Sequence, residues 1–148
     1  MWDSFRISAS ALTAQRLRMD VIASNIANAE TTRAQYADGR WVPYQRKMVV
    51  MEPSPAKPSF SAILDQAVHN SVGQGVRVTR IVHDTEPFKR VYNPTHPDAD
   101  QDGYVLMPNV DLLKEQVDLL GATRSYEANV TALNAAKSMF IKALEIGK

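Results

Sequence analysis

An acidic loop sequence is the sharpest local match in this chain to a known ligand-binding pattern. Residues 98–103 read Asp-Ala-Asp-Gln-Asp-Gly, which matches the first half of a calcium-binding EF-hand loop. The last position of such a loop should carry a glutamate, but Asn109 stands there. Pro97 and Pro108 also occupy the places where flanking helices would end and begin. These departures favour an acidic turn whose aspartates cap backbone N–H groups, and a calcium-binding module is kept as an alternative.

The other residue types that perform catalysis or hold cofactors are not arranged for either task. His69, His83 and His96 have no metal-ligand spacing and belong to no zinc-protease or triad pattern. The chain has no cysteine, which excludes disulfides, thiol catalysis and cysteine-based zinc sites. Residues 73–75 lack the third glycine of a phosphate-binding loop. The sequence therefore predicts no enzyme activity, no catalytic residue, no metal site, no cofactor and no small-molecule substrate.

Two long amphipathic segments at the ends of the chain carry the strongest periodicity. The first runs from about Phe5 to Ala29, without glycine or proline, and the second from Asp111 to Ile146. Their apolar residues recur mainly every seven positions, which is typical of a helix with one buried stripe. The stripe residues of the first segment are Phe5, Leu12, Met19, Ile22 and Ile26. Those of the second segment are Leu112, Leu119, Tyr126, Val130, Leu133, Phe140 and Leu144.

The residues between these segments read as a small β-rich and extended insert. The division along the chain is an N-terminal helix in residues 4–32, an insert in 33–108 and a C-terminal helix in 109–146. Residues 60–68 could form a short helix or a strand, and the prolines of residues 53–58 indicate a stiff connector. Alternation and β-branched residues predict strands at Trp41–Met51, Val76–Asp84, Lys89–Tyr92 and Tyr104–Met107. The fold class is mostly α with a small β insert.

Two helices alone cannot bury all of the apolar and small side chains that these segments carry. We expect the terminal helices to pair as a coiled-coil-like arm and to pack against copies or relatives in an assembly. Asn25 and Asn28 are poor residues for the middle of a helix. They are interpreted either as caps of a fraying helix end or as inter-subunit hydrogen-bonding groups that set the register. Both are included with the stripe residues in the predicted assembly interface.

The charge balance and hydropathy limit the possible partners and locations. Lys and Arg total 17 and Asp and Glu total 16, so no electrostatic argument favours nucleic acid. No apolar run is long enough to span a bilayer, and residues 1–19 lack the apolar core and cleavage site of a signal peptide. The chain is expected to be cytosolic or to leave the cytosol without a cleaved signal. A cytosolic coiled-coil adaptor is therefore a second alternative.

Several blocks of the sequence resemble the proximal rod proteins of the bacterial flagellum, within the flagellar rod and hook family. The resemblance covers nearly the whole chain. The blocks that carry it are Ser8–Arg16, Ser24–Thr32, Pro43–Lys47, Val76–Val78, Tyr92–Val110, Arg124–Val130 and Ala136–Met139.

The resemblance implies a structural building block of the flagellar basal body. Proteins of this family are expected to be exported unfolded by the flagellar type III apparatus, without a cleaved signal, and to assemble in the periplasm. Their terminal helices would pair and stack into a tubular drive shaft that transmits torque and surrounds the export channel. Expected partners are copies of the chain, other rod proteins, the rod-to-MS-ring adaptor and the export apparatus.

Overall fold

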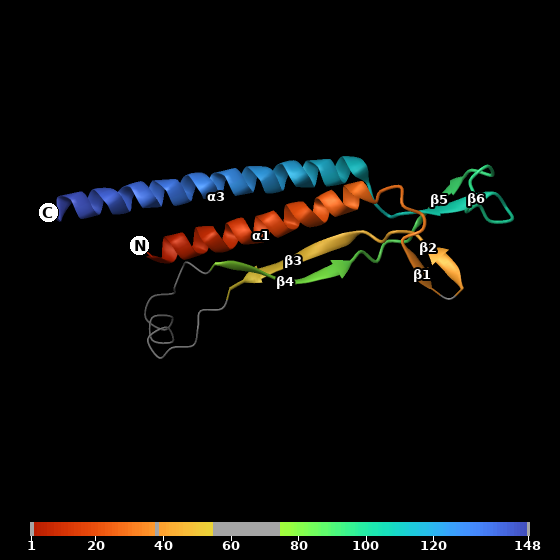
Figure 1. Cartoon of the computed structure of the whole chain (residues 1–148), viewed down its shortest axis with the longest axis horizontal. Helices are drawn as coiled ribbons and strands as arrows, with labels where there is room; N and C mark the ends of the chain where they lie inside the picture. Colours follow the sequence, from red (N-terminus) through yellow and green to blue (C-terminus); the bar gives the residue numbers. More distant parts are fainter. Residues whose placement is uncertain (1, 38, 55–74, 148) are drawn as a thin grey trace. The chain divides into compact units, whose positions relative to one another are not determined.

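The chain forms two terminal helices with short strand pairs between them. The computed structural model describes residues 2–37, 39–54 and 75–147. Helix α1 spans Trp2–Ala27 and helix α3 spans Leu112–Ile146, and Figure 1 draws them at the red and blue ends of the sequence. The strands are β1 (Gln35–Ala37), β2 (Arg40–Val42), β3 (Lys47–Pro53), β4 (Val76–His83), β5 (Lys89–Tyr92) and β6 (Tyr104–Met107). This order confirms the expectation of helical ends around a small β insert.

The strands form three separate hydrogen-bonded pairs. Strands β1 and β2 are antiparallel, with Ala37 opposite Arg40. Gly39 follows in the connecting turn with a φ of 80°, a conformation that glycine adopts without steric cost. Strands β5 and β6 are also antiparallel, with Lys89 opposite Met107 and Tyr92 opposite Tyr104. Strand β3 pairs with β4.

The single strand predicted at Trp41–Met51 is wrong, because residues 43–46 separate β2 from β3. Pro43 has no N–H to donate to a strand partner. The next backbone N–H groups are used elsewhere, since Tyr44 donates to the carbonyl of Thr31 and Arg46 donates to Oδ1 of Asn109. Tyr44 and Arg46 are both buried, so this break in the strand directs two polar side chains into the interior.

The remaining predicted elements agree with the structure within a few residues. Strand β4 ends one residue before the predicted Asp84, and β5 and β6 have the predicted bounds. Asp111 caps α3, because its Oδ1 accepts the N–H of Leu113 at 3.0 Å. Helix α1 ends two residues before the predicted Ala29, where Nδ2 of Asn28 donates to the carbonyl of Ser24. The predictions for residues 55–74 lie outside the described residues.

The chain divides into two compact units, and each takes residues from both helices and from the insert. One unit comprises the described parts of Met1–Leu17, Val50–Arg80 and Ala122–Lys148. Its buried apolar residues include three alanines, Ala14, Ala122 and Ala136. The other unit comprises Arg18–Val49 and Ile81–Gly121, apart from residue 38. Its interior contains larger side chains, among them Val21, Ile22, Val105 and Val110.

Each unit also has polar contacts that tie segments distant in sequence. In the first unit, Oγ of Ser10 accepts the N–H of Val76 at 3.1 Å and donates to the carbonyl of Ile7 at 2.7 Å. This places the start of β4 against the first half of α1.

Among the described residues, no helix is long and apolar enough to cross a membrane.

Candidate functional site

The most buried polar groups of the second unit form one connected cluster. We call Asn25, Tyr44, Arg46, Asp84, Asn109 and Glu115 the polar cluster. All six side chains belong to residues that are at least nine-tenths buried. They come from α1, from the segment between β2 and β3, from the turn after β4 and from the start of α3. The cluster therefore joins four stretches of chain that are far apart in the sequence.

Asn25 is the hub of the polar cluster on α1. Only 1% of its surface is exposed. Its Nδ2 donates to Oε2 of Glu115 at 3.0 Å and to the carbonyl of Lys47 at 2.9 Å. Its Oδ1 accepts the Tyr44 hydroxyl and the Lys47 N–H, each at 3.0 Å. An asparagine amide has two donor and two acceptor positions, so every one is used within the chain.

Arg46 is the charged centre of the polar cluster. Its Nε donates to Oε1 of Glu115 at 2.6 Å, and its Nη1 donates to Oδ2 of Asp84 at 3.0 Å. Its Nη2 also lies 3.6 Å from a carboxylate oxygen of Asp118. Glu115 has no exposed surface, and these are charge-assisted hydrogen bonds in a water-poor environment. A lone buried charge would be strongly unfavourable, so Arg46 and its carboxylate partners depend on each other.

The charges of Arg46 and Asp84 are stabilised in their ionised forms. The pKa of Asp84 is lowered, first because the N–H of Glu86 donates to the carboxylate and then because Arg46 donates to it. Burial alone would lower the pKa of Arg46, but its hydrogen bonds to Glu115 and Asp84 outweigh that effect and raise it. Both groups therefore stay charged at neutral pH, as the ion pair requires.

Asn109 extends the polar cluster to the backbone. Its Oδ1 accepts the N–H of Arg46 at 2.8 Å, and its Nδ2 donates to the carbonyl of Glu86 at 2.9 Å. The backbone N–H of Asp84 donates to the carbonyl of Arg46 at 2.8 Å. These bonds replace the strand ladder that Pro43 interrupts, and they position Arg46 beneath the first turn of α3. The arrangement is a structural joint between the insert and the two helices.

The structure places the predicted interface residues in different environments. Ile22 and Asn25 are buried within the chain. Asn28 bonds at the end of α1, where its Nδ2 donates to Ser24 and its Oδ1 accepts from the Thr31 hydroxyl. Leu112 and Leu144 are exposed. The half-buried members are Phe5, Leu12, Met19, Ile26, Leu119, Tyr126, Val130, Leu133 and Phe140.

The most exposed large apolar side chains in the first three turns of α3 are not among the predicted interface residues. Leu113, Val117 and Leu120 are 71%, 63% and 59% exposed. Their spacings of four and three place them on one face of the helix. We call these three residues the exposed α3 face. In the sequence, Leu113 and Leu120 widen the seven-residue stripe and Val117 lies outside it, but the predicted interface included Leu112 and Leu119 and none of these three residues.

The acidic loop is organised by contacts within the chain. Asp98 accepts hydrogen bonds from the Thr32 hydroxyl at 2.8 Å and from Nε of Arg33 at 2.6 Å. The Arg33 bond, followed by the Thr32 bond, lowers the pKa of Asp98. Gly103 has a φ of 78°, and its N–H donates to the carbonyl of Asp100. The described residues contain no group of three or more His, Cys, Asp or Glu side chains placed to hold a metal ion.

Sequence reasoning missed the roles of Arg46, Asp84 and Glu115. Asn109 was considered only as the last position of the acidic loop. Sequence spacing cannot reveal the bond between Arg46 and Glu115, because no sequence repeat relates a residue in a loop to a residue in a distant helix. The available signal was a run of polar residues, Tyr44 to Arg46, directly after a proline in an otherwise strand-like stretch.

Comparison with known proteins gives matches along nearly the whole chain. A family model described as flagella basal body rod protein matches residues 5–35. Another, described as flagellar basal body rod FlgEFG protein C-terminal, matches residues 101–146. These two matches cover most of α1 and all of α3.

Curated relatives called flagellar basal-body rod protein FlgC are similar from end to end. The relative from Bacillus subtilis is 58% identical over 98% of this chain and 97% of its own length. The relative from Borreliella burgdorferi is 44% identical over 99% and 97%, and that from Salmonella typhimurium is 42% identical over 97% and 96%. The similarity therefore extends over both helices and the insert.

Proposed function

The chain belongs to the flagellar basal-body rod proteins of the FlgC type, and from that premise we propose that its terminal helices build the wall of the rod. It is a structural subunit of the bacterial flagellar basal-body rod and assembles with other rod components. It is not an enzyme. The family membership gives no support to a calcium-binding module or a cytosolic adaptor.

The exposed α3 face is the observation that carries the proposal about the helices. Three large apolar side chains on one face of a helix remain uncovered in a single chain. Burying each such side chain would contribute about 1.5–3 kcal/mol, which gives a strong drive to associate. A neighbouring subunit in the rod would supply the missing cover. The half-buried stripe residues, Leu119 among them, would complete this contact. Helices α1 and α3 would pair as a coiled-coil-like arm.

The finer features of the proposal come from the family resemblance. The assembled helices would form a tube that surrounds the export channel and transmits torque from the motor. The subunit would pass through the type III export apparatus without a cleaved signal and assemble in the periplasm, next to the rod-to-MS-ring adaptor. The polar cluster suits a torque-bearing subunit, because its bonds hold α1, α3 and the insert together through groups that are all satisfied.

A substitution on the exposed α3 face tests the proposal. Val117→Asp places a charge where an apolar contact is proposed, so it should abolish swimming and remove the chain from purified basal bodies. The free energy of unfolding of the isolated subunit should stay within about 0.5 kcal/mol of wild type, because Val117 is mostly exposed.

The neighbouring variant Gln116→Asp is the matched control. It adds the same charge one residue earlier, at another exposed position of the same helix, and should leave swimming near wild type. Normal motility and normal basal-body content in Val117→Asp cells would overturn the proposed role of this face. Mass spectrometry of the same basal bodies would show whether the N-terminal peptide is uncleaved, as the export proposal requires.

A further inference from the structure

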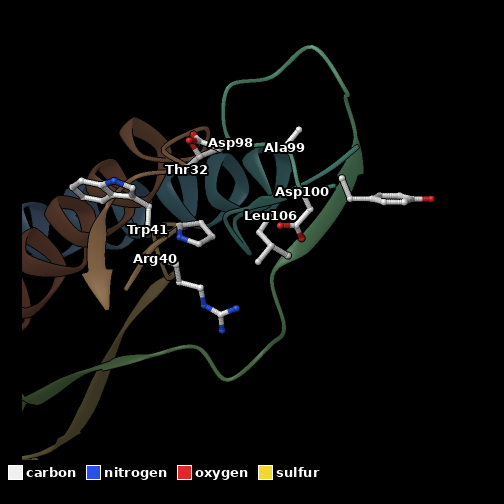
Figure 2. A pocket seen from close by; sticks show the side chains of 9 residues that line it. Thr32, Arg40, Trp41, Asp98, Ala99, Asp100 and Leu106 are labelled. Atoms are coloured by element: carbon white, nitrogen blue, oxygen red, sulfur yellow. The ribbon is translucent and has the colours of Figure 1, made fainter. Parts of the chain in front are cut away.

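The second unit contains a pocket of about 250 Å³ between the β1–β2 hairpin and the acidic loop. Its apolar lining comes from Trp41, Pro43, Tyr104 and Leu106, and charged groups lie at Arg40, Asp98 and Asp100. Figure 2 shows Arg40 and Trp41 on one side and Ala99, Asp100 and Leu106 on the other. The pocket is smaller than typical small-molecule sites, which hold about 300–1,000 Å³. Its size suits one side chain of a protein partner.

The walls of this pocket are already held in place. The Tyr36 and Trp41 rings meet edge to face with centroids 5.3 Å apart, across the β1–β2 pair. On the other wall, Tyr104 packs edge to face on Tyr92 at 5.3 Å. The hydrogen bond from Thr32 to Asp98 ties the segment after α1 to the acidic loop. A pocket whose walls are ordered beforehand loses little entropy when a partner enters.

Asp98 already pairs with Arg33, and the other two charged groups at the pocket can pair with a partner. Among the residues that the structure describes, the side chains of Arg40 and Asp100 have no hydrogen bond or ion pair. Trp41 is 51% exposed. This exposure suits a binding surface, because tryptophan and arginine are the residues that most often dominate protein interfaces. The pocket thus offers an apolar slot with a cation on one side and an anion on the other. A fitting partner needs one large apolar side chain between a carboxylate and an ammonium group.

The first turn of α3 presents that chemistry on the same chain. Residues 111–114 read Asp-Leu-Leu-Lys, and all four are exposed. Leu113 is 71% exposed. The Asp111 cap uses its Oδ1 for the helix, and within the described residues its other oxygen has no hydrogen bond. Charge order and apolar content therefore match the pocket.

We propose that the first turn of α3 of one copy of this chain docks into the pocket of a second copy. Leu113 would enter between Trp41 and Leu106, Asp111 would pair with Arg40, and Lys114 would pair with Asp100. The pocket and the docking turn are different surfaces of one subunit, so the contact is heterologous. Such contacts repeat into rings or open helical assemblies, which suits a rod. The inference rests on the proposed function, since it names a contact within the rod wall.

Cysteine cross-linking in assembled rods tests this contact directly. The natural chain has no cysteine, so introduced thiols are the only ones present in it. The variant carrying both Trp41→Cys and Leu113→Cys should form covalent dimers and larger multiples when purified basal bodies are oxidised. Either single variant should give no such ladder. A control pair, Val91→Cys with Leu113→Cys, uses an exposed strand residue outside the pocket lining and should give at least about tenfold less product.

A charge exchange supplies the second test. Asp100→Lys and Lys114→Asp should each lower the cross-linking yield at least about tenfold in the double-cysteine background. The two changes together should restore it, because the pair is re-formed with opposite polarity. Both residues are exposed, and the Asp100 carboxylate has no partner among the described residues, so the variants should fold.

The outcomes separate the docking proposal from the rod proposal. Basal bodies that contain the chain but give no 41–113 product would overturn the docking contact and leave the rod function intact. A cross-link from residue 41 to a different rod component would overturn the choice of a second copy. Absence of the wild-type chain from basal bodies would instead contradict the rod function itself.

Discussion

The polar cluster reaches α3 at Glu115, on the same stretch of the helix as the exposed α3 face, and the two have opposite chemistry. Glu115 is fully buried and bonded to two residues of its own chain. Val117, two residues later, is apolar and mostly exposed. A helix that turns a carboxylate inward and valine and leucines outward is unusual for a protein that works alone. The difference indicates that polar bonds hold the subunit together and apolar contacts join it to its neighbours.

The largest expected effect comes from removing Glu115. Glu115→Ala leaves Arg46 with a weaker set of partners and leaves one Asn25 donor unbonded in the interior. Breaking a buried ion pair costs about 3–5 kcal/mol, and we expect about 3 kcal/mol because Asp84 still balances the guanidinium. Urea unfolding of the purified subunit measures the change.

Glu127→Ala is the matched control for this prediction. Glu127 also pairs with an arginine, Arg124, but both side chains are exposed on α3. An exposed pair of this kind contributes at most about 0.5 kcal/mol. Equal losses in the two variants would mean that the polar cluster contributes nothing beyond a surface ion pair.

The two asparagines of α1 sharpen the comparison within a single helix. Asn25→Ala removes four hydrogen bonds, two of them fully buried, and should cost about 1–3 kcal/mol, because the Tyr44 hydroxyl and Glu115 lose a bond in the interior. Asn28→Ala removes only contacts at the helix end and should cost about 1 kcal/mol or less. Thermal unfolding of both variants checks the order, and a reversed order would contradict the role assigned to Asn25.

The pH dependence of stability should carry a smaller signature of Asp84. Its pKa is lower in the folded chain than in the unfolded chain, where an aspartate titrates near about 4. The stabilisation is therefore complete above that unfolded value and is lost as the pH falls through the folded pKa. Asp84→Asn should flatten the fall in unfolding free energy below about pH 5. An unchanged slope would show that the Asp84 ion pair does not stabilise the fold.

The elements of this fold follow from local sequence, and the polar cluster does not. The absence of glycine and proline in α1 and the cap at Asp111 were sufficient to predict both helices. Alternation was sufficient for β4, since each face of a strand repeats every second residue. The break at residues 43–46 could not be predicted, because its backbone partners, Thr31 and Asn109, are remote in the sequence.

The candidate surfaces show the same division between local and tertiary information. The predicted interface included Ile22, from the seven-residue pattern, and Asn25, as a polar residue in mid-helix, although both are buried within the chain. The predicted interface did not include Leu113 and Val117, whose exposure depends on which side of α3 the polar cluster holds inward. Periodicity identifies an apolar helix but does not say which face the chain itself covers.

Accessibility of residue 117 is the most direct measurement of the central claim. A Val117→Cys variant of the cysteine-free chain can be labelled with a maleimide as a monomer, in urea and in purified rods. The account predicts rapid labelling of the monomer, close to that of the urea-unfolded chain, because this position is mostly exposed. It predicts labelling at least about tenfold slower in assembled rods, because a neighbouring subunit covers the exposed α3 face. Equal rates in monomer and rod would contradict the claim that this face joins the subunits.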